Sequence, residues 1–66
     1  MPNPHQVVKV HLTATGPAGE TFAVATYANG RCGVTRDGTP IDGMEWPLDQ
    51  YDQCAAALAR LAGLGK

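Results

Sequence analysis

The stretch that decides the fold is TFAVATYANGRCGVTR, residues 21–36. In its first half Phe22 and Val24 alternate with other side chains, and in its second half Cys32 and Val34 do the same. A period of two residues is typical of a strand that buries one face. The stretch therefore predicts two strands joined by a tight turn.

The length of that turn sets which residues share a face, because a slip of one residue turns a whole strand over. A two-residue loop, Asn29-Gly30, would pair Val24 with Thr35 and divide the apolar residues between both faces. A three-residue loop, with a type I turn at residues 28–29 and Gly30 in the left-handed region, pairs Val24 with Val34 instead. We therefore expect the longer loop.

The same reasoning extends toward the N-terminus, where residues 5–15 also alternate. Pro17-Ala18-Gly19 suits a second loop of the same kind, and it places Leu12 opposite Val24. One apolar face is then expected. Its members are Val8, Val10, Leu12, Phe22, Val24, Cys32 and Val34.

The C-terminal part predicts an edge strand and a helix. Asp37-Gly38 suits a two-residue turn that would bring Ile41 beside Val34, and Pro40 would confine that strand to an edge. Apolar residues recur at helical spacing from Leu48 onward, on a helix with Pro47 in its first turn or Asp49 as its N-cap.

The predicted fold class is α+β: an antiparallel meander of three to four strands with one C-terminal helix packed on one sheet face. We expect a single domain. Its parts are a loose lead-in (1–4), the meander (5–36), a turn with a short edge strand and an acidic loop (37–46), and the helix (47–63).

Size and composition narrow the class of protein. Sixty-six residues with 44% hydrophobic content and a net charge of −1 suit one small globular domain, close to the size at which a partner subunit helps stability. The sequence has no long apolar run, so we expect a cytoplasmic protein. Its two cysteines, Cys32 and Cys54, are expected as buried free thiols rather than as one bridge.

The predicted helix covers one sheet face and leaves the other open, and this open face is the main candidate site. The register sets Lys9, Tyr27 and Arg31 in one row and His11, Ala25 and Gly33 in the next. A protein partner or a second copy is expected to dock there, with Tyr27 and Arg31 as anchors. The alternatives are a small nucleic-acid-binding surface, with Tyr27 stacking on a base and Lys9 and Arg31 holding phosphates, and an ordinary solvated surface.

Two further surfaces are candidates for contact with a partner. The strand at residues 5–15 lies at an edge of the meander and is long enough to accept an added strand, unless Lys9 protects that edge. Residues 37–59 hold five acidic side chains and no Lys or Arg. Asp37, Asp42 and Glu45 in this part form a secondary acidic surface suited to a basic partner.

The sequence favours binding over catalysis. It contains no serine, and the pair Cys32 and His11 is expected on opposite sheet faces, which prevents a nucleophile–base contact. His5 and His11 lack a third metal ligand, so we expect no metal, cofactor, small-molecule substrate or membrane partner. A homodimer, or a compact inhibitor of a larger complex such as the anti-CRISPR proteins of phages and mobile elements, is the expected type. The inhibitor suggestion rests on size alone.

Overall fold

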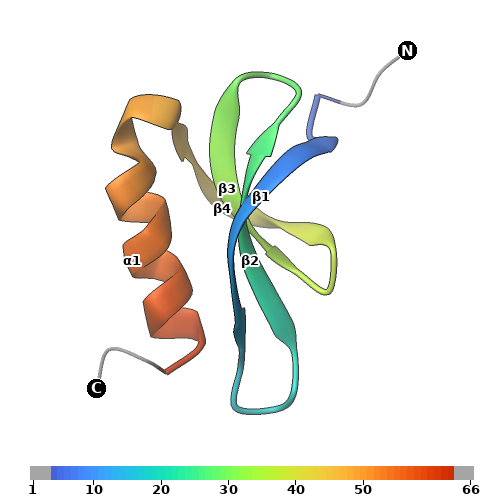
Figure 1. Ribbon diagram of the computed structural model, residues 1–66, viewed down its shortest axis with the longest axis vertical. Helices are drawn as coiled ribbons and strands as arrows, with labels where there is room; N and C mark the ends of the chain where they lie inside the picture. The colour runs from blue at the N-terminus through green and yellow to red at the C-terminus, as the bar shows by residue number, and fades with distance from the viewer. Residues whose placement is uncertain (1–3, 64–66) are drawn as a thin grey trace.

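The computed structural model describes residues 4–63 and shows one four-stranded antiparallel sheet followed by a helix (Figure 1). Strands β1 (Val7–Thr15), β2 (Thr21–Tyr27), β3 (Arg31–Arg36) and β4 (Thr39–Pro47) are neighbours in chain order. A short 3-10 turn (Leu48–Gln50) leads into α1 (Tyr51–Leu61), which packs on the sheet. The predicted α+β meander is confirmed.

Both three-residue loops form as expected. Gly19 and Gly30 have φ values of 86° and 82°, in the left-handed region that glycine tolerates. The predicted pairs Leu12–Val24 and Val24–Val34 are both present. The turns therefore set the register of β2 and β3 as the sequence indicated.

The core lies between the sheet and α1. Phe22, Val24, Cys32 and Val34 from the two central strands are buried in one cluster with two helical side chains, Cys54 and Leu58. Both cysteines are free and buried, as predicted. The hydrophobic side chains excluded from water here supply the main favourable term for folding.

The prediction for β1 is wrong in part. Val8, Val10 and Leu12 were expected in the core, but their exposed fractions are 60%, 51% and 44%. Register shifts occur between Val7 and Lys9 and again between Val10 and Leu12. Each adds one residue to β1 without a counterpart in β2, so the side chains between the two shifts leave the expected alternation.

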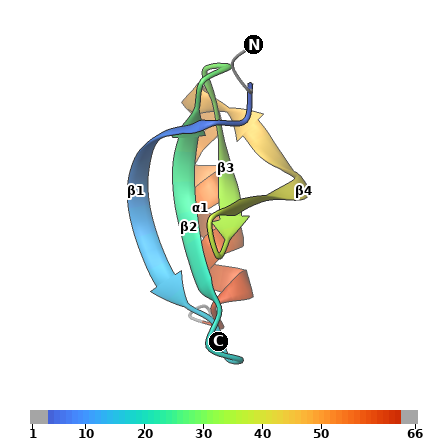
Figure 2. The same cartoon turned by 90° about the vertical axis from the view of Figure 1, so that its right-hand side faces the viewer.

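Strand β4 replaces most of the predicted acidic loop. It runs to Pro47 rather than ending after Ile41, and Trp46 pairs with Cys32. Pro40 does lie in an edge strand, as expected. Between the pairs Thr35–Pro40 and Gly33–Glu45 the strand holds extra residues, and there it bends sharply (Figure 2).

The helix is shorter than the predicted range 47–63. Pro47 keeps the extended backbone of β4, with ψ at 148°, and the 3-10 turn precedes α1. No side-chain cap bond forms at the start of either helical segment, so Asp49 is not an N-cap. In the described part of the chain, no helix is long and apolar enough to cross a membrane.

The face away from α1 is not the open floor that the sequence predicted. Ala25 and Tyr27 are 0% and 2% exposed, and Gly33 is buried. A Cβ added at Gly33 would lie 2.6 Å from both the Tyr27 hydroxyl and the Met44 carbonyl oxygen. Tyr27 is diagonal to Gly33 across the strand pair, so its ring reaches over the glycine and closes this face.

We predict that Gly33→Ala destabilises the protein by about 2 kcal/mol, because the new methyl group must displace the Tyr27 ring or the β4 backbone. Denaturant unfolding followed by circular dichroism measures the change. Thr13→Ala, at an exposed position of β1, is the control and should stay within about 0.5 kcal/mol of the wild type. Equal stabilities for Gly33→Ala and the wild type would contradict this packing.

Candidate interaction surfaces

The outer edge of β1 carries the exposed large hydrophobic side chains of the sheet. No strand of the described residues pairs with this edge, because the order is β1-β2-β3-β4. Val8, Val10 and Leu12 lie on this strand with about half of each side chain exposed; Val10 pairs with Ala25 of the face away from α1, and Leu12 pairs with Val24 of the helix side. Lys9 is the one formally charged residue of β1. We call Val8, Val10 and Leu12 the β1 apolar strip.

The other edge is less suited to accept a strand. β4 contains Pro40 and ends at Pro47, and neither can donate a backbone hydrogen bond. Its bend, with Gly43 at φ 81°, also interrupts the line of backbone groups. Natural sheets protect edges with these features. β1 has two register shifts of its own but contains no proline or glycine, so it is the less protected edge.

His11 does not lie on the face where the sequence placed it. Val10, not His11, pairs with Ala25. The His11 ring lies against Tyr51 of α1, with centroids 5.4 Å apart, and its Nε2 is 2.6 Å from Thr26 Oγ1. The register shift before Leu12 is the cause, since it carries His11 to the helix side.

This shift also changes the relation between His11 and Cys32. Thr26, the bonding partner of His11, pairs directly with Cys32, so all three residues share the helix side. The Cys32 thiol, however, is fully buried and donates to the carbonyl oxygens of Trp46 and Pro47 at 3.6 and 3.7 Å. A catalytic pair needs a hydrogen bond between the nucleophile and its base. The Cys32 thiol instead makes its contacts with these two carbonyl oxygens.

The predicted row of Lys9, Tyr27 and Arg31 does not form. Lys9 pairs with Thr26, and Val7 takes the place opposite Tyr27. Arg31 turns to Glu45, with its Nε 2.7 Å from Glu45 Oε2. Lys9 is therefore not opposite the Tyr27 ring, and Arg31 is engaged by Glu45.

Glu45 is the centre of a polar cluster at one end of the sheet. Its carboxylate lies 2.6 Å from His5 Nε2, accepts a longer bond of 3.4 Å from Asn29 Nδ2, and pairs with Arg31. Arg31 and His5 are about half exposed, so solvent screens these contacts and their effect on stability is small. The Glu45 carboxylate is thus engaged by three neighbouring side chains, whereas the sequence predicted it as part of an acidic surface for a basic partner.

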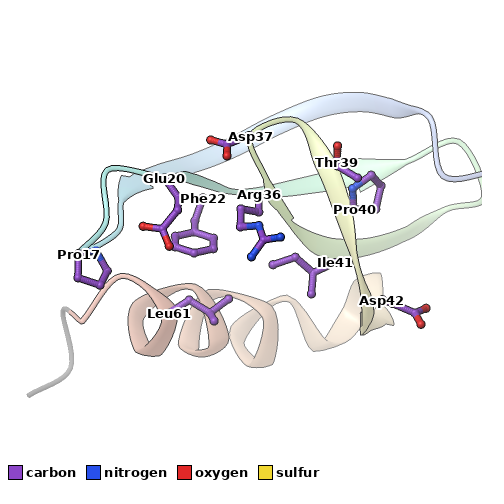
Figure 3. A pocket seen from close by; sticks show the side chains of 10 residues that line it. All are labelled: Pro17, Glu20, Phe22, Arg36, Asp37, Thr39, Pro40, Ile41, Asp42 and Leu61. Carbon is purple, nitrogen blue, oxygen red and sulfur yellow. The ribbon is translucent and has the colours of Figure 1, made fainter.

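The other two residues of the predicted acidic surface line a cleft of about 660 Å³ between the sheet and the end of α1 (Figure 3). Asp37 also accepts a hydrogen bond from the Thr21 backbone N–H at 3.0 Å, and Asp42 lies at the far end of the cleft. Asp37 and Asp42 thus line the same cleft at separate places, and Glu45 is not among the lining residues.

The same cleft contains a cation and an apolar wall. The Arg36 guanidinium lies between the Phe22 ring and Ile41 (Figure 3), and it forms no ion pair within residues 4–63. Glu20 adds a third carboxylate, which accepts a bond from the Ala18 backbone N–H. Because opposite charges are mixed, the cleft has no single sign that would select a charged ligand.

Tyr27 contributes a buried hydroxyl to the second face of the sheet, the face away from α1. Within residues 4–63, its hydroxyl is the buried side-chain polar atom with no hydrogen-bond partner. Burial, followed by the nearby Cys54, Glu45 and Cys32, raises the pKa of Tyr27 to about 12. The hydroxyl is therefore neutral at any physiological pH.

The β1 apolar strip is the surface that sequence reasoning missed. Alternation alone placed all three side chains in the core, and no proline or glycine within residues 7–15 marks the register shifts. The composition of helix α1 held a signal, because its two buried residues, Cys54 and Leu58, share one cluster with the central strands, and the partly buried strand residues packed on that cluster come mainly from β4. A helix this small leaves an edge strand uncovered.

We predict that the Tyr27 hydroxyl titrates near pH 12 in the folded protein. The folded pKa lies above the unfolded value of about 10, so the associated stability is complete below pH 10 and is lost between pH 10 and 12. Phenolate absorbance should be measured in Tyr51→Phe, where Tyr27 is the remaining tyrosine. The same variant in guanidinium, with a midpoint near 10, is the reference. A midpoint near 10 in the folded protein would contradict the burial of Tyr27.

Comparison with known proteins does not place the chain in a family: it matches no protein-family model, no curated protein and no solved structure. Its function is therefore argued from its own surfaces.

Proposed function

We propose that this protein acts by binding a polypeptide through the outer edge of β1, and that its partner is a second copy of the same chain. The observation that carries the proposal is the β1 apolar strip on an unpaired edge strand. Strand edges of this kind bind through backbone hydrogen bonds, and side chains beside the edge add specificity.

Self-pairing suits the chemistry of β1. An antiparallel pairing about a two-fold axis at Val10 sets Val8 of each copy opposite Leu12 of the other. This pairing is self-complementary, as a two-fold interface requires, and it sets Val10 of one copy against Val10 of the other. Lys9 then faces His11 of the other copy, so the two lysines do not oppose each other. The apolar contacts are made without a repulsion between like formal charges.

The size of the chain also favours a second copy. With 66 residues, one core is near the lower limit for stability, and a partner that covers exposed hydrophobic side chains adds to it. The register shifts in β1 interrupt the regular spacing of its backbone groups, which restricts the strands that can pair with it. The edge thus favours a matched partner over indiscriminate association.

The other readings of the sequence have less support. A nucleic-acid platform needs an exposed aromatic ring, whereas Tyr27 is 2% exposed. Docking on the second sheet face meets the same difficulty, because its central residues are buried. An inhibitor of a larger complex, as among the anti-CRISPR proteins, gains no support beyond the size of the chain. The free cysteines fit a reducing compartment such as the cytosol.

We predict that light scattering finds a mass approaching twice 6.9 kDa as the protein concentration rises. Val10→Glu should hold the mass near that of one chain, because it places a carboxylate at the centre of the pairing. Circular dichroism should show an unchanged fold, since Val10 is 51% exposed.

Leu48→Glu is the matched control for this experiment. Leu48 is a similarly exposed hydrophobic residue, at 48%, but it lies in the 3-10 turn rather than on β1. The Leu48 variant should associate like the wild type. A wild type that stays monomeric at every concentration, or equal dissociation of both variants, would show that the β1 edge does not join two copies.

A further inference from the structure

The cleft between the sheet and the end of α1 contains an arginine, Arg36 (Figure 3). Arg36 is the last residue of β3 and pairs directly with Phe22 of β2. Directly paired residues of an antiparallel sheet share a face, so Arg36 lies on the helix side together with Phe22. Helix α1 ends there at Leu61, and Phe22 is buried whereas Arg36 is exposed. The cleft of about 660 Å³ at this point is large enough for a small organic molecule.

The Arg36 guanidinium has hydrogen-bond donors to offer. In the part of the chain that the structure describes, it makes no ion pair and no hydrogen bond. Three carboxylates line the same cleft, yet none of them engages it. Glu20 and Asp37 each accept a bond from a backbone N–H, at 2.9 and 3.0 Å, and the Asp42 carboxylate points away from Arg36 (Figure 3). The N–H groups of the planar guanidinium are therefore available to a ligand.

Apolar side chains surround this cation. The guanidinium lies between the Phe22 ring and Ile41, and Leu61 projects from α1 into the same cleft (Figure 3). Pro17 and Pro40 extend the apolar lining. A guanidinium binds a carboxylate through two parallel hydrogen bonds, and such bonds are stronger beside apolar groups, where the local dielectric is lower. A hydrocarbon group attached to the carboxylate would gain free energy by covering these apolar walls.

The other charges of the cleft limit the charge of a ligand. Glu20, Asp37 and Asp42 contribute negative charge, and the C-terminal end of α1 adds the negative end of the helix dipole. Repulsion grows in proportion to the charge of the ligand, so a dianion such as phosphate is disfavoured relative to a carboxylate. Phosphate also has no apolar part to place against the walls. A ligand is thus selected by contact with Arg36 and with the walls, rather than by the field of the whole cleft.

We propose that this cleft binds a monocarboxylate with an apolar body, such as an alkyl- or arylcarboxylic acid. Its carboxylate binds the Arg36 guanidinium, and its hydrocarbon part packs against Phe22, Ile41 and Leu61. The lining residues come from the turn between β1 and β2, from β2, β3 and β4, and from α1. The cleft is therefore separate from the β1 apolar strip, and its occupation does not depend on the proposed pairing of two copies.

The test is titration of the full chain with phenylbutyrate, followed through the backbone amide resonances in NMR spectra. We expect a dissociation constant of about 1 to 5 mM, with the largest shifts at the amides of Phe22, Ile41 and Leu61. The neutral amide of phenylbutyric acid should bind about ten-fold more weakly, because it loses the charged contact with Arg36. Acetate, which has the carboxylate but little apolar surface, should also bind about ten-fold more weakly.

Two arginine variants test the contact from the side of the protein. Arg36→Gln keeps a polar side chain at this exposed position and should weaken the binding of phenylbutyrate about ten-fold. Arg60→Gln is the matched control, because Arg60 is also exposed, makes no ion pair within residues 4–63 and does not line the cleft. It should bind phenylbutyrate within about two-fold of the wild type, since solvent screens its charge. Circular dichroism should show that both variants keep the fold.

A polypeptide can offer the same chemistry at its C-terminus. The probe for this source is an N-acetylated tripeptide that ends in phenylalanine. If it binds more tightly than phenylbutyrate, and if Arg36→Gln weakens it, the carboxylate that the cleft takes is the end of a polypeptide. If phenylbutyrate binds more tightly, the ligand is a free acid. Both results support a carboxylate site at Arg36.

Three results would overturn the proposal. The first is the absence of amide shifts around the cleft at about 20 mM phenylbutyrate. The second is equal affinity of Arg36→Gln and the wild type for phenylbutyrate. The third concerns the ligands and does not depend on any variant: equal affinity for phenylbutyrate and its neutral amide would exclude a contact with the carboxylate, and equal affinity for phenylbutyrate and inorganic phosphate would exclude a role for the apolar walls.

Discussion

The packing of α1 on the central strands is the contact on which the rest of the structure depends. The apolar face of a sheet must be buried against another element, and Cys54 and Leu58 of α1 supply this layer. Because this one helix covers one face, the second face must be closed by the sheet itself. Tyr27 lies across Gly33 for this purpose, and the absence of a side chain at Gly33 makes the close approach possible.

The strong coiling of the sheet links this packing to the candidate binding surface. Register shifts in β1 increase the local twist of the strand, and they turn His11 toward Tyr51 at the start of the helix. The same shifts leave Val8 and Val10 outside the core. One irregularity thus places a polar contact between β1 and α1, and it also leaves hydrophobic side chains on an unpaired edge.

The sequence was sufficient for the parts of the fold that turns control. Gly30 and Gly19 could be assigned left-handed positions because only a three-residue loop gave one apolar face, and the pairs Val24–Val34 and Leu12–Val24 followed. A register shift within a strand does not require a glycine at one fixed position. Residues 7–15 alternate without interruption, so nothing in them indicated that His11 would cross to the helix side, and the predicted open face inherited that error.

The candidate site was harder to predict than the fold because it depends on what the helix leaves uncovered. Tyr27 was interpreted as exposed. It is diagonal to Gly33 on the next strand, and this arrangement favours an aromatic ring that lies over the glycine.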